Sequence, residues 1–153
     1  MNKIFAFLSV LTLALVPLLV SPSASAVGGW SGLRCKTYSS SAARVCTEVY
    51  LASEPTRITQ LRLCAEKVPQ QYFNGFVGTK ESHWEVFGSN GDYKGGGGVD
   101  DVQNATTTLK CALTPAGFNV GLSACYTVWG TLQLNGWPDA DYVINGGVNG
   151  GAC

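Results

Sequence analysis

Residues 118–134 read FNVGLSACYTVWGTLQL, and this stretch decides the fold class. Its even positions are apolar except at Gly130, whereas most of its odd positions are polar or small. A period of two residues predicts a β-strand with one buried face and one face nearer water. The 17 residues would extend over roughly 56 Å at about 3.3 Å each. That is too long for one strand of a small domain, so we expect a bend or turn at Gly121 or Gly130.

The first 26 residues have the features of a secretory signal peptide. Lys3 supplies a positive charge, residues 4–20 form an apolar stretch, and Ala24-Ser25-Ala26 resembles a cleavage site. The apolar stretch is short for a membrane span, and no second one follows it. We therefore expect residues 1–26 to be removed and residues 27–153 to form one secreted, extracellular domain.

The cysteine count predicts three disulfides. The six cysteines are Cys35, Cys46, Cys64, Cys111, Cys125 and Cys153. An even number behind a signal peptide is typical of a disulfide framework, and six cysteines allow about 15 pairings. Spacing along the chain favours Cys35–Cys46 and Cys111–Cys125, which leaves Cys64–Cys153. The chain has a single histidine and no Cys-x-x-Cys motif, so we expect neither a zinc site nor any other metal or cofactor.

Residues 42–52 and 57–68 are compatible with either strands or helices. In the first stretch Val45, Thr47 and Val49 alternate with polar residues, and β-branched side chains favour strands. In both stretches a second set of apolar residues recurs at helical spacing, and the second stretch is rich in good helix formers. We predict strands in both.

The rest of the chain shows short strand-like segments separated by turn residues. We predict strands over residues 81–87, 105–113 and 141–145, a short helix over 69–75, a flexible loop over the four glycines 95–98, and a turn over 115–117. Six to eight short strands with turns between them predict a mainly β, single-domain protein. The expected architecture is an antiparallel β-sandwich or a small barrel with about three disulfides.

The charge balance narrows the classes of partner. Removal of Lys3 leaves nine Lys and Arg against ten Asp and Glu, so the net charge is about −1. No basic block is present, which argues against a nucleic acid or an anionic membrane as partner. The plentiful aromatic and aliphatic residues argue against a disordered chain. The remaining candidates are an extracellular protein or a glycan of unknown identity.

One polar cluster suggests chemistry. In a strand, Glu81, His83 and Glu85 share one face. A carboxylate beside the imidazole would raise the pKa of the histidine and orient its ring, as acid/base catalysis requires. The alternative is a solvated strand face, with Trp84 and Val86 directed to the core. The chain has no second histidine and no Gly-x-Ser-x-Gly motif, so we do not expect an enzyme.

The second candidate site centres on Trp129. This residue lies on the odd face of the opening stretch, between Thr127 and Thr131, and Trp137 follows it closely. An exposed indole on a polar sheet face can stack on a sugar ring or anchor a protein partner. The alternative is a structural tryptophan that is covered by a loop or by the bridge at Cys125.

Three hypotheses of function follow. The leading one is a secreted β-sandwich that acts as a binding or interaction module for a carbohydrate or a protein. The second is a small secreted hydrolase that uses His83 with Glu81 or Glu85, and the third is a structural protein of the cell surface. A concave pocket holding the histidine and both glutamates beside an arginine would favour the hydrolase. A fully buried Trp129 would exclude the aromatic platform.

Overall fold

The computed structural model describes residues 28–38, 42–52, 57–68 and 75–153, and every regular element in these ranges is a β-strand. The strands are β1 (Gly29–Trp30), β2 (Arg34–Tyr38), β3 (Ala43–Ala52), β4 (Arg57–Lys67), β5 (Val77–Phe87), β6 (Tyr93–Gly98), β7 (Lys110–Asn119), β8 (Cys125–Leu134) and β9 (Ala140–Gly147). The described ranges contain no helix long and apolar enough to cross a membrane. The predicted signal peptide, and all but Gly75 of the predicted helix over 69–75, lie outside these ranges.

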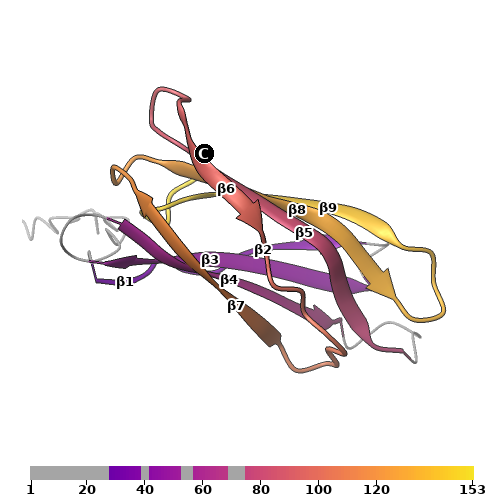
Figure 1. Cartoon of the computed structure of the whole chain (residues 1–153). Helices are drawn as coiled ribbons and strands as arrows, with labels where there is room; N and C mark the ends of the chain where they lie inside the picture. Colours follow the sequence, from indigo (N-terminus) through magenta and orange to yellow (C-terminus); the bar gives the residue numbers. More distant parts are fainter. Residues whose placement is uncertain (1–27, 39–41, 53–56, 69–74) are drawn as a thin grey trace, which may run out of the picture.

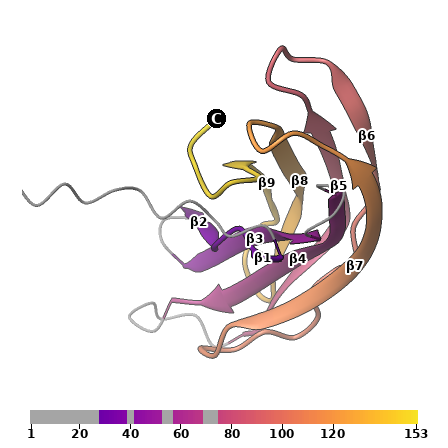
Figure 2. The ribbon, with the colours of Figure 1, turned by 90° about the vertical axis from the view of Figure 1, so that its left-hand side faces the viewer.

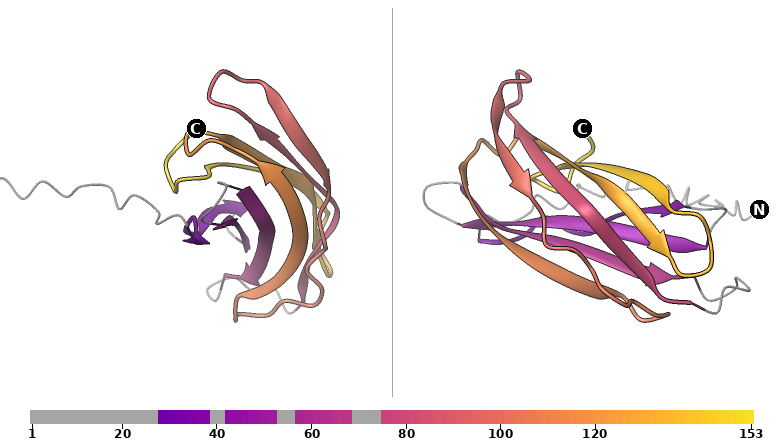
Figure 3. Two further views of the ribbon diagram at one scale, coloured as in Figure 1. Left: turned by 60° about the vertical axis from the view of Figure 1, so that its left-hand side comes forward. Right: turned by 45° about the vertical axis from the view of Figure 1, so that its right-hand side comes forward.

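The strands form two antiparallel sheets packed face to face (Figure 1), which confirms the predicted β-sandwich. Sheet A has the order β1-β3-β4-β7, with β2 also paired to β3, and sheet B has the order β6-β5-β8-β9. At the two margins the sheets approach each other, β6 against β7 and β2 against β9 (Figure 2). The strands of the two sheets cross at an angle over the core (Figure 3).

Alternation along each strand builds the core. Most inward side chains of β3, β4, β5, β8 and β9 are apolar and fully or almost fully buried, and the largest are Tyr126, Tyr142, Leu51, Ile58, Leu61, Leu63 and Leu132. Trp84 and Val86 face this core, as the pattern around His83 predicted. The two stretches that were ambiguous in sequence are strands β3 and β4, because their alternating apolar residues are the ones that fill the core.

The opening stretch divides at Gly121, one of the two predicted positions. Strand β7 ends at Asn119 and β8 begins at Cys125. Between them the chain turns, with the backbone N–H of Ala124 donating to the carbonyl of Gly121 at 3.0 Å. Gly130 does not interrupt the strand and lies inside β8.

Two predicted loops and one strand boundary were wrong. The four glycines of residues 95–98 belong to strand β6. A Cβ atom at Gly95 would lie 2.1 Å from the ring of Phe118, so close packing rather than flexibility requires a glycine there. The predicted turn over 115–117 continues β7, which tolerates Pro115 because it is an edge strand. That strand starts only at Lys110, since Ala105 forms an isolated bridge with Val77 instead.

The disulfides are Cys35–Cys46, Cys64–Cys111 and Cys125–Cys153. The first confirms the prediction, and the predicted pairs Cys111–Cys125 and Cys64–Cys153 were wrong. Strand β7 pairs with β4 in sheet A, which places Cys111 opposite Cys64, whereas Cys125 begins β8 in the other sheet. Three disulfides are compatible with an extracellular protein, since such bonds persist in oxidising compartments.

Candidate functional site

The outer face of sheet B carries the predicted binding residues. Thr127, Trp129, Thr131 and Gln133 alternate outward along β8, between β5 and β9. This face is hollowed in two places. The first hollow, here the Trp129 hollow, has a volume of about 440 Å³, and the second, here the amide hollow, has a volume of about 300 Å³.

A β-bulge in β5 shapes the Trp129 hollow. Lys80 pairs with Thr131 and His83 pairs with Trp129, so two residues of β5 face only Gly130 of β8. One of these two, Glu81, has a φ of 53°, a left-handed conformation that costs roughly 1–3 kcal/mol in a residue other than glycine. Bulges bend a strand and redirect side chains, and here the bulge directs two successive side chains, Lys80 and Glu81, outward.

Beneath the bulge, side-chain hydrogen bonds link β9, through β5, to the loop that follows β6. The Tyr142 hydroxyl donates to Ser82 Oγ at 2.6 Å, and Ser82 Oγ donates to a carboxylate oxygen of Asp101. The same Asp101 oxygen accepts from Thr79 Oγ1 at 3.0 Å, and Thr79 Oγ1 accepts from the backbone N–H of Val102 at 2.9 Å. The bulge allows Thr79 and Ser82 both to point inward, although three positions separate them. The Trp129 hollow on the outer face and the hydrogen-bond network on the inner face therefore both depend on the bulge in β5.

Burial of the Tyr142 hydroxyl makes stability depend on pH. Burial raises the pKa of Tyr142 from 10.0 to about 12, which outweighs the lowering effect of its hydrogen bond with Ser82. The folded state holds this proton more tightly than the unfolded state, so the stabilisation is complete below pH 10 and is lost as pH rises to 12.

We expect the free energy of unfolding, measured by urea denaturation, to fall between pH 10 and 12. Burial also raises the pKa of Tyr38 and Tyr126, so Tyr142→Phe should flatten this fall without abolishing it. An equally steep fall in the Phe variant would contradict the assignment to Tyr142.

Trp129 is partly buried and forms one wall of its hollow together with His83. The two rings are stacked, with centroids 6.0 Å apart and planes 20° apart. His83 Nδ1 lies 2.9 Å from the backbone carbonyl of Glu81. Because a carbonyl oxygen can only accept, Nδ1 carries the proton, which fixes the ring and leaves Nε2 as the acceptor in the neutral form.

The opposite wall of the Trp129 hollow comes from β9. Asp141 and Val143 line it, and the side chain of Val143 is 46 % exposed. Asp141 accepts a hydrogen bond from the Thr131 hydroxyl at 3.4 Å, and on the other side of Trp129 the Thr127 hydroxyl donates to Asn145 at 2.9 Å. An aromatic ring, an aliphatic side chain and oriented carboxylate and hydroxyl groups thus surround one concave surface.

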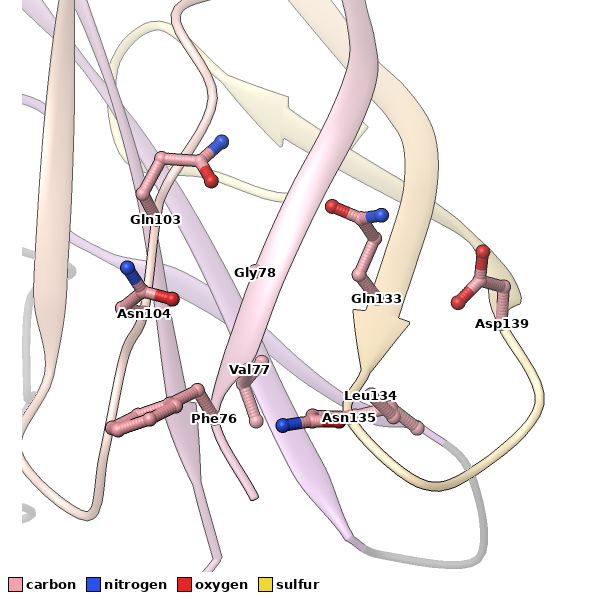
Figure 4. Close-up of a pocket in the computed structure, with 9 residues that line it drawn as sticks. All are labelled: Phe76, Val77, Gly78, Gln103, Asn104, Gln133, Leu134, Asn135 and Asp139. Carbon is pink, nitrogen blue, oxygen red and sulfur yellow. The ribbon is translucent and has the colours of Figure 1, made fainter.

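The amide hollow lies farther along sheet B, at the end of β8, and Figure 4 shows the residues that line it. Its floor is Gly78, with Gln103 and Asn104 on one side and Gln133 and Asp139 on the other. The loop that carries Gln103 pairs with β5, since the backbone N–H of Thr79 donates to the carbonyl of Val102 at 2.9 Å. A Cβ atom at Gly78 would lie 3.1 Å from that carbonyl, so the glycine both admits the loop and keeps the floor open.

An ion pair separates the two hollows. Lys80 Nζ lies 2.7 Å from a carboxylate oxygen of Asp139, and this hydrogen bond is the main reason that the pKa of Lys80 is raised. Asp139 lines the amide hollow, and Lys80 stands beside Glu81 of the Trp129 hollow.

The distance between the two hollows limits the shape of a ligand that could fill both. Gln133 and Trp129 are four residues apart on β8, which corresponds to roughly 13 Å along a strand. A ligand that fills both hollows must therefore be elongated.

The structure brings together most of the residues that the sequence singled out. Trp129, Thr131, Glu81 and His83 line one hollow, whereas Thr127, Glu85 and Trp137 do not. His83 contacts the backbone carbonyl of Glu81 and not its carboxylate, and no arginine lines the hollow. In the part of the chain that the structure describes, no three histidine, cysteine or acidic side chains are grouped as a metal site requires.

The sequence did not predict the amide hollow. Its lining comes from the start of β5, the loop after β6, the end of β8 and the β8–β9 connection, and these segments meet because β5 pairs both with that loop and with β8. In the structure Asn104 of this hollow has a φ of 52°, a left-handed conformation that asparagine tolerates. A scan against protein-family models and a search of curated proteins found no match to the chain.

Proposed function

We propose that this protein is a secreted carbohydrate-binding module whose ligand lies along the outer face of sheet B. The observation that carries the proposal is the Trp129 hollow, in which a partly exposed indole stands beside the Thr131 hydroxyl and the Asp141 carboxylate, which a cross-strand hydrogen bond joins. Sugars have apolar faces that stack on aromatic rings and hydroxyl groups that exchange hydrogen bonds with carboxylates and amides. Concave sites with few, well-placed polar groups are typical of ligand binding.

Charge argues for a neutral sugar. Three carboxylates line the two hollows, those of Glu81, Asp139 and Asp141, and the ammonium group of Lys80 pairs with one of them, Asp139. An anionic glycan would meet net repulsion on this face. The amide hollow supports the same choice, because side-chain amides donate to and accept from sugar hydroxyls without requiring a charged partner.

A glycan array probed with the oxidised protein tests the proposal. We expect binding to neutral oligosaccharides, tighter binding to longer chains that reach both hollows, and little binding to sialylated or sulfated glycans. Absence of binding to all neutral glycans would reject a carbohydrate ligand.

Trp129→Ala should weaken binding to the best neutral glycan at least tenfold, about 1.4 kcal/mol, because it removes the stacking surface. The matched control is Tyr93→Ala, which removes an aromatic ring that is 61 % exposed on β6 and lines neither hollow. Affinities are measured by titration calorimetry. Equal affinity in wild type and Trp129→Ala would place the ligand elsewhere.

A further inference from the structure

Four cysteines stand in one row across sheet A. Cys35 on β2 lies opposite Cys46 on β3. Cys64 on β4 lies opposite Cys46 on one side and opposite Cys111 of β7 on the other. Disulfides join the first two and the last two members of the row. The central pair, Cys46 and Cys64, also lies directly opposite across β3 and β4, so its side chains emerge on one face as neighbours.

Exposure differs along the row. Cys35 and Cys111 are on outer strands and are exposed to solvent, whereas Cys46 and Cys64 are fully buried. Each disulfide therefore has one accessible residue and one shielded residue. A thiol from solution reaches Cys35 or Cys111 first, and attack there expels the buried partner as a thiolate.

We propose that this cysteine row is a thiol-exchange site that takes up a small thiol at one edge of sheet A and releases a thiolate at the other. The incoming thiolate attacks Cys35 Sγ, forms a mixed disulfide there and expels the Cys46 thiolate. The Cys46 thiolate attacks Cys64 Sγ, forms a Cys46–Cys64 bond and expels the Cys111 thiolate. Two disulfides are broken and two are formed, so no oxidant or reductant is consumed. Attack of the small thiolate at Cys111 starts the equivalent exchange in the opposite direction along the row and releases the Cys35 thiolate.

Burial supplies the driving force for the second step. A thiolate at Cys46 would be a buried charge, and burial disfavours the charged form of a thiol. Transfer of the bond to Cys64 moves the charge to Cys111 on an exposed edge strand. The pairs that flank the central cysteines on the same face are Arg44–Glu66 and Arg62–Glu48. In each pair the two charges offset each other, so they do not compensate a buried thiolate.

Limited reduction of the wild-type protein tests the proposal. Oxidised protein is treated briefly with glutathione, alkylated with iodoacetamide and mapped by mass spectrometry without further reduction. We expect a Cys46–Cys64 linked peptide, together with glutathione on one outer cysteine and alkylation of the other. Partly reduced chains in which Cys46 or Cys64 is itself alkylated, and no Cys46–Cys64 peptide, would overturn the proposal. The Cys125–Cys153 bond lies outside the row and serves as an internal control, since it should open without exchange.

A single substitution gives a second test. In Cys35→Ser, one cysteine of the row has no partner, and the exchange should move the free thiol from Cys46 to Cys111. We expect rapid maleimide labelling of the native variant at Cys111 and a Cys46–Cys64 bond. A thiol that stays on Cys46 and reacts only after denaturation would contradict the proposal. In the matched control Cys125→Ser, the free thiol should remain on Cys153. The wild-type experiment needs no variant and decides the question if Cys35→Ser does not fold.

Discussion

Replacement of Cys64 and Cys111 together by alanine is expected to lower the free energy of unfolding by about 4 kcal/mol. The bridge joins residues 47 positions apart, and a cross-link over a long segment removes much of the freedom of the unfolded chain. It also fastens edge strand β7 to β4, and β7 contributes no fully buried residue to the sandwich. Because a small domain has a total stability of about 5–15 kcal/mol, this change alone should remove between about a quarter and about four fifths of the free energy of unfolding.

The other two bridges provide matched controls. Their sequence separations are 28 residues for Cys125–Cys153 and 11 residues for Cys35–Cys46. The same entropic relation gives losses of about 3.5 and about 3 kcal/mol for the corresponding double alanine variants. Urea denaturation under oxidising conditions measures all three, and removal of cysteines in bonded pairs leaves no odd thiol. The largest loss for the Cys35–Cys46 pair would contradict the entropic explanation.

The second large effect concerns Gly96 in edge strand β6. A Cβ atom at this position would lie 2.3 Å from the backbone carbonyl oxygen of Trp84 and 3.2 Å from the Cα atom of Glu85. These are backbone atoms of the neighbouring strand, so an alanine fits only if β6 moves away from β5. We expect Gly96→Ala to lower the free energy of unfolding by about 2–3 kcal/mol, in the range of overpacked cores, measured by thermal unfolding.

Gly97→Ala is the matched control. The two glycines are adjacent in β6, but a Cβ atom at Gly97 would have no atom within 4 Å. Because alanine restricts the unfolded chain more than glycine does, we expect Gly97→Ala to be neutral or to stabilise by about 0.4–1 kcal/mol. Equal losses for Gly96→Ala and Gly97→Ala would show that strand propensity, and not the close approach of β6 to β5, explains the glycines.

The sequence predicted the features that depend on local pattern. Alternation in residues 42–52, 57–68 and 118–134 identified strands and their buried faces, except at Leu122, which lies between β7 and β8 and is exposed. Each residue's side is set by its immediate neighbours in the chain. The fold class follows from these segments and from the cysteine count. Trp129, Thr131 and His83 were also placed on outward faces by alternation alone.

Features that depend on strand partners were not predictable in this way. Two disulfides were mispaired because short spacing suggested a hairpin between Cys111 and Cys125, whereas the strands that carry them belong to different sheets. The bulge at Glu81 arises from the pairing of β5 with β8. The amide hollow needs three segments brought together by β5, and no period or motif in the sequence records which strands are neighbours.

The central claim is that the outer face of sheet B binds a neutral glycan. An NMR titration of the oxidised, isotope-labelled protein with the neutral oligosaccharide that binds best on the array tests this claim most directly. We predict that the backbone amide signals of Thr127, Trp129, Thr131 and Gln133 shift progressively and saturate, while those of β3 and β4 remain unchanged. Shifts confined to sheet A, or no saturable shifts along β8, would contradict the account.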